Sequence, residues 1–354
     1  MAVYREINLE MTISTKKLAV LSQLKKAQSS LSLPEISVLM ADAIPERTLR
    51  RWLFAWVESG ILERTGQKRG TRYQLKDSAL INGVADPVGN YKSPLTYKFL
   101  NDIPRHRRSA VLEQIRDLWT HNSTALEGNT LTLGDTHAVL ELGLTVSGKP
   151  LREHQEILGH AKAIELLYQS ISTPLTKETI YKLHKAVQTE IVHDIYKPVG
   201  AWKVEVNGTY AVSSEARQVF IEYAHPMHVD GLMEAVVDFI NAVDVSTISL
   251  KTAARYFAKV HMAIVHIHPF SDGNGRIARL LANIILLKAG LPPLVVEKSQ
   301  RRKYIECLAD YQIKVGQLTN TTGLWPNEEA LESFISFCEY SYKATKELIS
   351  EAKK

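Results

Sequence analysis

The sequence predicts a mainly α protein in which a helical bundle carries one β-hairpin and follows a small N-terminal domain. Apolar residues recur at helical spacing from about Arg105 to the C-terminus. Within that helical part, Asn207-Gly208 stands between two short alternating segments, which indicates a hairpin. Near the N-terminus, three short helical patterns precede a polar turn flanked by two strand-like segments. These three observations determine the predicted fold class.

Length and composition are those of an ordinary soluble protein of two domains. The chain has 354 residues, of which 45% are hydrophobic and 23% are charged. No apolar run approaches the roughly 20 residues of a membrane span, and the N-terminus lacks the apolar core of a secretory signal. We therefore expect no membrane partner. Cys307 and Cys338 stand far apart in helical patterns, so we expect free, buried thiols and a cytoplasmic location.

The N-terminal domain is expected to span residues 1–78. Its first helix carries leucines at helical spacing: Leu18, Leu21 and Leu24. Ser32 is placed to cap a second helix that Pro34 begins. A third helix begins near Pro45, with an inner face of Leu49, Leu53 and Trp56. Residues 61–75 then predict a hairpin about the polar turn 66–70. Three helices followed by a basic hairpin resemble a winged helix-turn-helix domain.

The basic excess of the chain lies in this N-terminal part. Residues 1–76 hold 13 Lys and Arg against 7 Asp and Glu, whereas the rest of the chain holds 30 against 31. In a winged helix the third helix enters the major groove and the hairpin contacts phosphates. The residues expected to contact DNA in this way are Arg47, Arg50, Arg51, Lys68, Arg69 and Arg72. Winged helices also bind proteins, so both kinds of partner remain open for this domain.

Residues 79–104 are less regular and are expected to form a linker or docking arm before a helical domain, 105–354. A helical run begins at Val111, and helical patterns continue at 177–191, 229–243, 250–267, 276–289, 301–315 and 328–350. One hairpin interrupts them, with expected strands at 202–206 and 209–212 and Asn207-Gly208 as the turn. The hairpin is either surface decoration or an edge that receives an extended peptide by strand addition.

A glycine-rich loop between two of these helices predicts a phosphate site. The helix that precedes it runs into His268 and is stopped by Pro269. Gly273 and Gly275 let backbone amides turn inward, and the helix that follows adds its unpaired N–H groups and positive dipole end. On that helix, Arg276 and Arg279 stand three residues apart and suit a polyphosphate. Beside them, Asp272 is a hard oxygen ligand for Mg²⁺, and His268 is placed to take a proton from an attacking hydroxyl.

The string HPFSDGNGR, followed by Arg279, matches at every fixed position the signature of the Fic family, HxFx[DE]GNGRxxR. The resemblance extends over roughly residues 105–340 and implies a Fic-type helical bundle. Fic proteins mostly transfer AMP from ATP to a Tyr, Ser or Thr hydroxyl of a protein. The resemblance implies that His268 is the general base, that Phe270 anchors the loop in the core and that Asp272 binds Mg²⁺. It further implies an ATP-binding set of Gly273, Asn274, Gly275, Arg276 and, for the γ-phosphate, Arg279.

A second Fic feature lies upstream, near residues 122–128. Ser123, Glu127 and Gly128 match the fixed positions of the inhibitory motif [ST]xxxE[GN]. By resemblance, Glu127 pairs with Arg279 and prevents productive placement of the γ-phosphate. The hairpin matches the target-docking flap of the family, with the flap residues Lys203, Val204, Glu205, Val206, Asn207, Gly208, Thr209 and Tyr210. Lys203 replaces a frequent Arg of the family, which leaves the choice of target open.

The sequence thus predicts an autoinhibited protein adenylyltransferase that uses ATP and Mg²⁺ and modifies a hydroxyl of a target protein or of itself. Two alternatives remain open at this stage. The first is a DNA-binding regulator whose Fic domain senses nucleotide or modifies the regulator. The second is a Fic enzyme that removes AMP, in which Glu127 positions water. A homodimer is a further expectation, on which the sequence alone does not decide.

Overall fold

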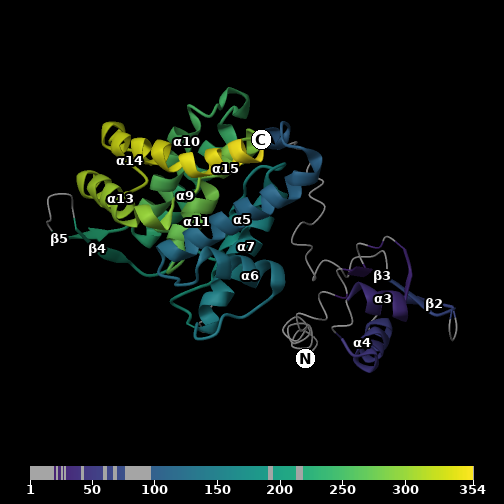
Figure 1. Cartoon of the computed structure of the whole chain (residues 1–354). Coiled ribbons are helices and arrows are strands. Elements are labelled where there is room, and N and C mark those ends of the chain that lie inside the picture. The colour runs from purple at the N-terminus through teal and green to yellow at the C-terminus, as the bar shows by residue number, and fades with distance from the viewer. Residues whose placement is uncertain are drawn as a thin grey trace. The chain divides into compact units, whose positions relative to one another are not determined.

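In the computed structural model the chain forms two compact units, one of residues 1–89 with 142–144 and one of residues 90–141 with 145–354. The structure describes residues 20, 23–24, 27, 29–40, 44–58, 62–66, 70–75, 97–189, 194–212 and 218–353, apart from the side chains of residues 55, 58 and 75. The N-terminal unit and the C-terminal unit are described separately below (Figure 1).

The N-terminal unit combines two described helices with a three-stranded antiparallel sheet of order β1-β3-β2. Its elements are β1 (Leu31–Ser32), α3 (Leu33–Leu39), α4 (Glu46–Glu58), β2 (Leu62–Thr65) and β3 (Arg72–Leu75). Ser32 caps α3 as predicted, because its hydroxyl accepts the Glu35 N–H while the Glu35 carboxylate accepts the Ser32 N–H at 2.7 Å. The predicted third helix and hairpin are confirmed, and the winged-helix assignment stays a prediction. Leu18 and Leu21 lie outside the described residues.

The core of the N-terminal unit lies between the two helices and the sheet. The predicted inner face of α4 is buried, and Ile36 from α3 and Leu62 from β2 pack against it. The buried residues of α4 are Leu49, Leu53 and Trp56. Their spacing of three and four residues gives one apolar stripe, which explains why this short helix packs against its neighbours on a single face.

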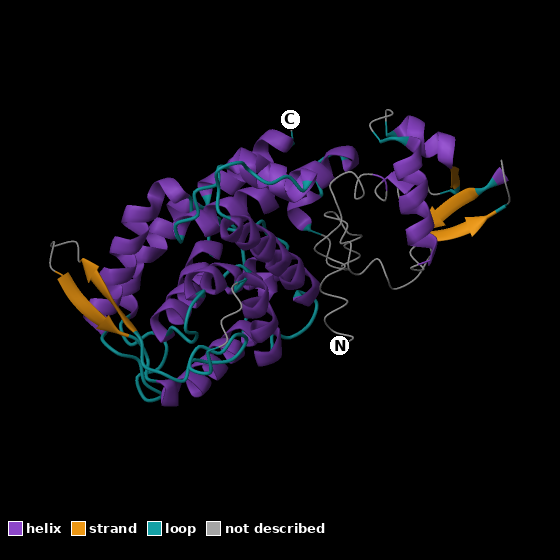
Figure 2. Cartoon of the chain, turned by 90° about the horizontal axis from the view of Figure 1, so that it is seen from below, coloured by secondary structure: helices purple, strands orange, loops and turns teal. Residues whose placement is uncertain are grey.

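The C-terminal unit is a helical bundle with a hairpin at one end (Figures 1 and 2). Its helices are α5 (Arg108–Leu126), α6 (Leu133–Leu142), α7 (Leu151–Ser170), α8 (Lys177–Val187), α9 (Pro226–Ala242), α10 (Ala253–Ile267), α11 (Asn274–Leu281), α12 (Ile284–Lys288), α13 (Arg301–Val315), α14 (Glu328–Ser341) and α15 (Lys343–Ala352). Short 3₁₀ turns occupy Lys98–Leu100, Arg105–Arg107, Val245–Thr247 and Lys298–Gln300. The central helix is α10, which is apolar on nearly every side and contacts α9, α11, α12 and α14.

Part of the predicted linker belongs to the core of the C-terminal unit. Phe99, Leu100 and Ile103 pack with Val111 of α5 and Ile349 of α15 in one buried cluster. Three large apolar side chains lie within five residues, and burying them stabilises the fold. This stretch therefore packs in the core and does not form a free linker. Residues 79–96 of the predicted linker lie outside the described residues.

Two helices predicted as continuous are interrupted. The pattern at 276–289 forms α11 and α12, because the Asn283 side chain donates to the Arg279 carbonyl at 3.0 Å while the Asn283 N–H turns to Leu280 at 3.1 Å. The pattern at 328–350 likewise forms α14 and α15, with the break at Tyr342. Periodicity alone does not show such breaks, since the apolar face continues across them.

The predicted hairpin register is wrong. The strands are β4 (Gly208–Val212) and β5 (Gln218–Glu222), with Gly208 opposite Glu222, so Asn207-Gly208 does not form the turn. Residues 202–207 are not a strand because their polar groups bond elsewhere. The Lys203 N–H donates to the Pro269 carbonyl at 2.8 Å, and the Asn207 amide donates to the Phe270 carbonyl at 3.2 Å. Tertiary hydrogen bonds thus override the local hairpin signal.

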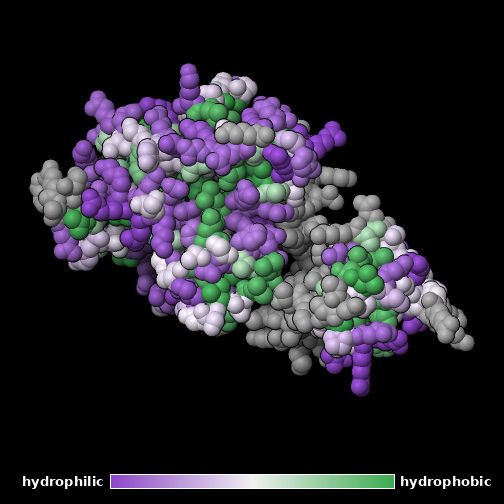
Figure 3. Space-filling view, viewed as in Figure 1, coloured by the Kyte–Doolittle hydropathy of each residue, from purple (hydrophilic) through white to green (hydrophobic). Residues whose placement is uncertain are grey.

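The two cysteines are free and buried, as predicted. In the part of the chain that the structure describes, no helix combines the length and apolarity of a membrane span. The surface in Figure 3 is a mixture of polar atoms and smaller apolar patches. Exposed leucines of the C-terminal unit include Leu133, Leu151 and Leu158.

Candidate active site

The site begins where α10 ends at His268. This residue has φ 52° and ψ 60°, and among the described residues it is the one non-glycine residue with a positive φ. A left-handed conformation costs an L-residue about 1–2 kcal/mol. Neighbouring contacts must offset that cost, and such strain is often found at functional sites.

The His268 imidazole is held in one orientation and in the neutral form. Its ring stacks on Tyr223, with centroids 3.8 Å apart and planes at 3°. Nδ1 donates to the Val265 carbonyl at 3.3 Å, so Nε2 carries the lone pair. Burial lowers the pKa of His268 to about 4, and the nearby Lys203 ammonium adds to this effect. At neutral pH the residue is therefore able to accept a proton at Nε2.

Phe270 anchors the loop in the core, as the resemblance implied. It is fully buried and stacks on the His184 ring with centroids 3.8 Å apart. The Asn274 side chain closes the loop, since it accepts the Phe270 N–H and donates to the Phe270 carbonyl, both at 2.9 Å. The amide side chain of Asn274 is thus used within the loop, and its backbone N–H remains the group suited to a phosphate.

His184 supports the same loop, a role that no sequence pattern indicates. Its Nδ1 accepts the Gly200 N–H at 2.8 Å, so Nε2 carries the proton and donates to the Asp272 carbonyl at 3.1 Å. Burial lowers the pKa of His184 to about 4, which keeps this arrangement neutral. A histidine in the last turn of a helix carries no local signal of such a role.

The N-terminus of α11 is the place where the sequence predicts an anion cradle. Gly273 caps the helix with φ 76°, a conformation that glycine adopts without strain. In the first turn, a Cβ on Gly275 would collide with the Glu127 Oε1 atom. The carboxylate of Glu127 therefore lies directly against the first turn of this helix, where backbone N–H groups and the helix dipole favour an anion.

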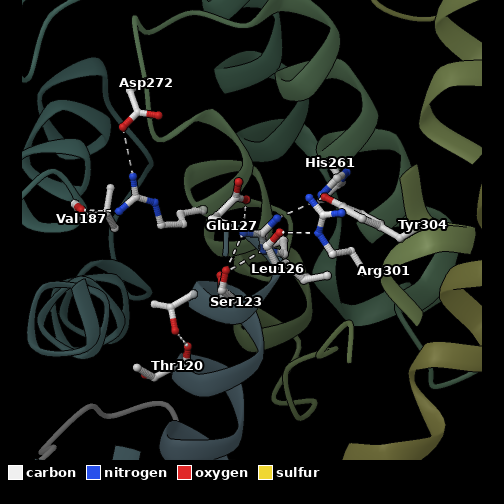
Figure 4. A network of polar contacts seen from close by, with 12 residues as sticks. Thr120, Ser123, Leu126, Glu127, Val187, His261, Asp272, Arg301 and Tyr304 are labelled. Carbon is white, nitrogen blue, oxygen red and sulfur yellow. Dashed lines mark hydrogen bonds and ion pairs between the residues drawn. The ribbon is translucent and has the colours of Figure 1, made fainter. Parts of the chain in front are cut away.

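Arg279 joins the Glu127 carboxylate to Ser123 of α5. Figure 4 shows Ser123, Glu127 and Tyr304 of this network. The Arg279 guanidinium donates to Glu127 Oε1 at 2.6 Å, to the Ser123 hydroxyl at 3.0 Å and to the Ser123 carbonyl at 2.8 Å. It also donates to the Tyr304 hydroxyl at 3.2 Å, and this hydroxyl forms a hydrogen bond with His261 Nε2 at 2.9 Å. The ion pair implied for Glu127 and Arg279 is thus present in the structure, and Tyr304 and His261 are partners that the sequence did not reveal.

The turn that carries Glu127 is fixed from several sides. Glu127 is the C-cap of α5, and Gly128 follows with φ 107°. Arg301 Nε donates to the Leu126 carbonyl at 2.9 Å, which satisfies one of the last carbonyls of the helix. Beyond the turn, the Asn129 amide donates to the Glu153 carbonyl at 2.9 Å. The predicted inhibitory motif therefore lies at the C-terminal end of a long helix and is anchored by α13 and α7.

Arg276 and Arg279 turn to different neighbours. Arg276 donates to the Val187 carbonyl at the end of α8 at 2.8 Å and pairs with Asp272 at 3.3 Å. The two guanidinium groups therefore bond to different elements, Arg276 to the end of α8 and Arg279 to α5. The Asp272 side chain itself is 65% exposed.

The predicted flap residues are distributed over two different elements. Lys203 is buried and Asn207 bonds to the loop, whereas Val204 and Val206 are exposed outside the sheet. Gly208, Thr209 and Tyr210 lie in β4, and the Tyr210 ring, 71% exposed, packs on Phe220 of β5. Glu205 is also exposed.

Of the residues expected to contact DNA, four are described. Arg47, Arg50 and Arg51 are exposed on α4, where Arg50 pairs with Glu46 at 2.6 Å. Arg72 pairs with Glu35 at 3.3 Å and donates to the Ser30 carbonyl at 2.6 Å. Lys68 and Arg69 lie outside the described residues. Two of the four described arginines are thus engaged with acceptors of their own domain.

Comparison with known proteins gives one consistent result. A model of the Fic/DOC family matches residues 174–286. The protein adenylyltransferase fic-1 of Caenorhabditis elegans is 35% identical over 196 residues, which cover 54% of this chain and 35% of that protein. The protein adenylyltransferase Fic of Drosophila erecta is 34% identical over 190 residues, or 53% of this chain and 35% of that protein. The chain thus spans about a third of the length of these relatives.

The solved structures agree with this result. A Fic domain containing signaling protein from Bacteroides thetaiotaomicron superposes with a TM-score of 0.62 at 27% identity, covering 73% of this chain and 94% of that one. Residues 134–508 of C. elegans Fic-1 superpose with a TM-score of 0.50 at 22% identity, covering 98% and 90%, which shows a shared fold alone. The signature loop, the helices around it and these matches together show that the chain carries a Fic domain of the Fic/DOC family.

Proposed function

We propose that the protein transfers AMP from ATP to a Tyr, Ser or Thr hydroxyl of a target protein. The observation that carries this proposal is the position of His268. A neutral imidazole with its lone pair on Nε2 stands at the entrance of a helix N-terminus built to hold an anion. The curated relatives are named protein adenylyltransferases, which supports the same reaction.

The reaction follows from these groups. His268 Nε2 accepts the proton of the target hydroxyl as its oxygen forms a bond to the α-phosphorus of ATP. The bond from that phosphorus to the bridging oxygen of the β-phosphate breaks, and pyrophosphate leaves. The N–H groups of the first turn of α11 stabilise the charge that develops on the phosphates. Catalysis then depends on positioning and electrostatics, with no covalent enzyme intermediate.

The residues of the loop fit Mg²⁺ bound together with ATP. In the described part of the chain, no group of three or more His, Cys, Asp or Glu side chains is placed to hold a metal alone. Mg²⁺ in nucleotide sites is commonly held by one or two carboxylates together with phosphates and water. Asp272, exposed next to the cradle, is the carboxylate that would hold it. When bound, Mg²⁺ would neutralise charge on the departing phosphates.

Glu127 would keep the enzyme in a weakly active state. Its carboxylate takes the Arg279 donors that the γ-phosphate needs and lies against Gly275 in the cradle. ATP can still approach the loop, but its triphosphate cannot adopt the productive position until this carboxylate moves. Relief would then come from a partner that displaces the last turn of α5.

The direct test uses ATP labelled at the α-phosphorus in native lysate. We compare the full chain with the Glu127→Gly, His268→Ala and doubly substituted variants. Label should enter protein strongly with Glu127→Gly, weakly with the unsubstituted chain, and not at all with either variant that lacks His268. If Glu127→Gly labels no protein, or labels protein equally well without His268, the transferase proposal is wrong.

A second proposal concerns the N-terminal unit, which we propose as an adaptor that binds DNA phosphates. Arg47 and Arg51 support it, since both are exposed on the same helix. A gel-shift assay with Arg47→Glu and Arg51→Glu tests it. The shift should be lost with these two charges and retained with Arg72→Gln, because Arg72 is engaged by Glu35. An equal loss with all three variants would contradict this assignment.

We also propose, from single observations, AMP removal and self-association. The Glu127 side chain is 44% exposed beside the cradle, which would let it position water against an AMP-protein bond. Release of AMP from labelled product by the unsubstituted chain, but not by Glu127→Gly, would support this activity.

The proposed homodimer rests on the exposed Leu151 and Leu158 of α7. Substitution of both residues by Asp should dissociate the homodimer in light-scattering measurements. Label transferred to the chain itself in the absence of other proteins would show auto-modification.

A further inference from the structure

The segments that enter and leave the hairpin both contact the chain around His268. We call them the hairpin root and define it as residues 203–207, which precede β4, and Tyr223, which follows β5. The resemblance to the Fic family places residues 203–207 in the target-docking flap. Their hydrogen bonds run instead to the junction between α10 and the glycine-rich loop.

Three carbonyls on the two sides of His268 accept hydrogen bonds from this root. The Lys203 ammonium donates to the Ile267 carbonyl at 3.3 Å, and the Lys203 N–H donates to the Pro269 carbonyl at 2.8 Å. The Asn207 amide donates to the Phe270 carbonyl at 3.2 Å. These contacts fix the chain immediately before and after the residue that holds a left-handed conformation.

The root is also held together internally and contacts the imidazole itself. Asn207 Oδ1 accepts from the Lys203 ammonium at 2.5 Å, and the Asn207 carbonyl accepts the Tyr223 N–H at 3.1 Å. Tyr223 then stacks on the His268 ring, and its own carbonyl accepts from the Gln317 amide at 2.9 Å. The backbone on both sides of His268 and the His268 ring thus contact one connected set of residues: Lys203, Asn207 and Tyr223.

We propose that the hairpin root positions His268, with Lys203 and Asn207 as positioning residues that hold the strained turn and aim Nε2 at the reacting hydroxyl. The inference rests on the proposed transferase function. It gives the hairpin a role beyond contact with a target, because the residues that flank its two strands also hold His268 in place. Lys203 and Asn207 act through His268 and need not touch substrate.

The charges around His268 predict a signature that a purely structural role would not give. The Lys203 ammonium is 3% exposed, and burial lowers the pKa of Lys203 to about 8. It lowers the pKa of His268, whereas the carboxylates of Glu127 and Asp272 raise it. Tyr223 is neutral, since burial raises its pKa to about 12. Removing the Lys203 charge should therefore shift the His268 titration upward.

The experiment uses the full chain with Glu127→Gly, so that activity is measurable, and adds Asn207→Asp, Lys203→Met or Lys203→Arg. Asn207→Asp keeps the size of the side chain and the acceptor for Lys203, but cannot donate to the Phe270 carbonyl. Tyr210→Ala, on the outer face of β4, is the matched control for target docking. Readouts are kcat, KM for target, ATP affinity and the titration of His268 by histidine-labelled NMR, with the signal assigned by its loss in His268→Ala.

We expect Asn207→Asp and Lys203→Met to lower kcat about tenfold or more, the effect of losing one or two hydrogen bonds, with ATP affinity within about twofold. Lys203→Arg should restore most of kcat, and Tyr210→Ala should raise KM alone. The His268 titration should move toward 6.5 in Lys203→Met. Unchanged kcat and an unchanged His268 titration in both root variants would overturn the proposal. The NMR readout needs no turnover. A shifted His268 titration without any AMP transfer would contradict the transferase function and still support the positioning role.

Discussion

Replacing Glu127 by Gly should raise the rate of AMP transfer by about 10- to 30-fold. The contact to be removed is a charge-assisted hydrogen bond of 2.6 Å between Glu127 Oε1 and a buried Arg279. Hydrogen bonds to charged groups contribute about 1.5–3 kcal/mol. Because the Glu127 side chain is 44% exposed, water screens it, and the lower end of that range, about 1.5–2 kcal/mol, applies. At about 1.4 kcal/mol for each factor of ten, this gives the stated increase.

A graded series separates charge from bulk. Glu127→Gln retains the side chain and a weaker neutral hydrogen bond to Arg279, so its rate should fall between those of the unsubstituted chain and Glu127→Gly. Glu127→Gly also removes the atoms that lie against Gly275. Glu165→Gln is the matched control, since this glutamate of α7 forms an ion pair with Lys162 on the same helix at 3.0 Å. It should leave the rate unchanged.

The assay is the initial rate of incorporation of label from α-labelled ATP at fixed target concentration. Each variant is also measured with His268→Ala, which should abolish the signal. Equal rates for the unsubstituted chain, Glu127→Gln and Glu127→Gly would show that the ion pair does not limit ATP placement. A gain in Glu165→Gln as large as that in Glu127→Gly would show that loss of any acidic residue is sufficient.

Three further predictions follow from the buried histidines and from Gly275. Burial lowers the pKa of His268 to about 4, and the base acts as neutral imidazole. The value of kcat/KM for ATP should therefore stay level from pH 8 to below 6.5 and fall as the pH approaches 4. An inflection at or above pH 6.5 would contradict the lowered pKa of His268. Burial lowers the pKa values of His160 and His261 well below 6.5, so below that pH the unfolded chain binds more protons than the folded chain. The free energy of unfolding measured in urea should therefore be highest above pH 6.5 and decrease as the pH falls below it. A stability that rises on acidification from pH 6.5 would refute that linkage. Gly275→Ala should abolish ATP binding in calorimetry even with Glu127→Gly, because the methyl group would occupy the cradle that the carboxylate now fills; binding restored by Glu127→Gly would show that the cradle is not the phosphate site.

Local signals predicted the elements whose determinants are local. Ser32 with Glu35 forms the capping box at the helix start where Ser32 was expected as the cap, and Leu49, Leu53 and Trp56 form the buried inner face expected of the third helix. The signature loop was recognised from its residues, and both glycines have a physical reason: Gly273 has φ 76°, and a Cβ on Gly275 would collide with Glu127. The same holds for Glu127, whose ion pair with Arg279 is present as the resemblance implied.

The sequence could not show groups whose partners lie far away along the chain. Residues 202–207 alternate and end in Asn-Gly, yet carbonyls more than 60 residues away, at Ile267 and Phe270, determine their conformation. Tyr304 and His184 support Arg279 and the loop from separate helices, with no local pattern to indicate it. Arg276 turned to α8 because the end of that helix offers an unpaired carbonyl, which only the packed structure reveals.

The most direct test of the account follows the fate of the two ends of ATP in a single reaction. The Glu127→Gly protein is incubated with target and Mg²⁺, once with ATP labelled at the α-phosphorus and once with ATP labelled at the γ-phosphorus. We expect label on protein from the α-phosphorus alone, with the γ-label released as pyrophosphate, and neither outcome with His268→Ala. Label on protein from the γ-phosphorus, or α-label that persists without His268, would contradict the reaction proposed for this loop.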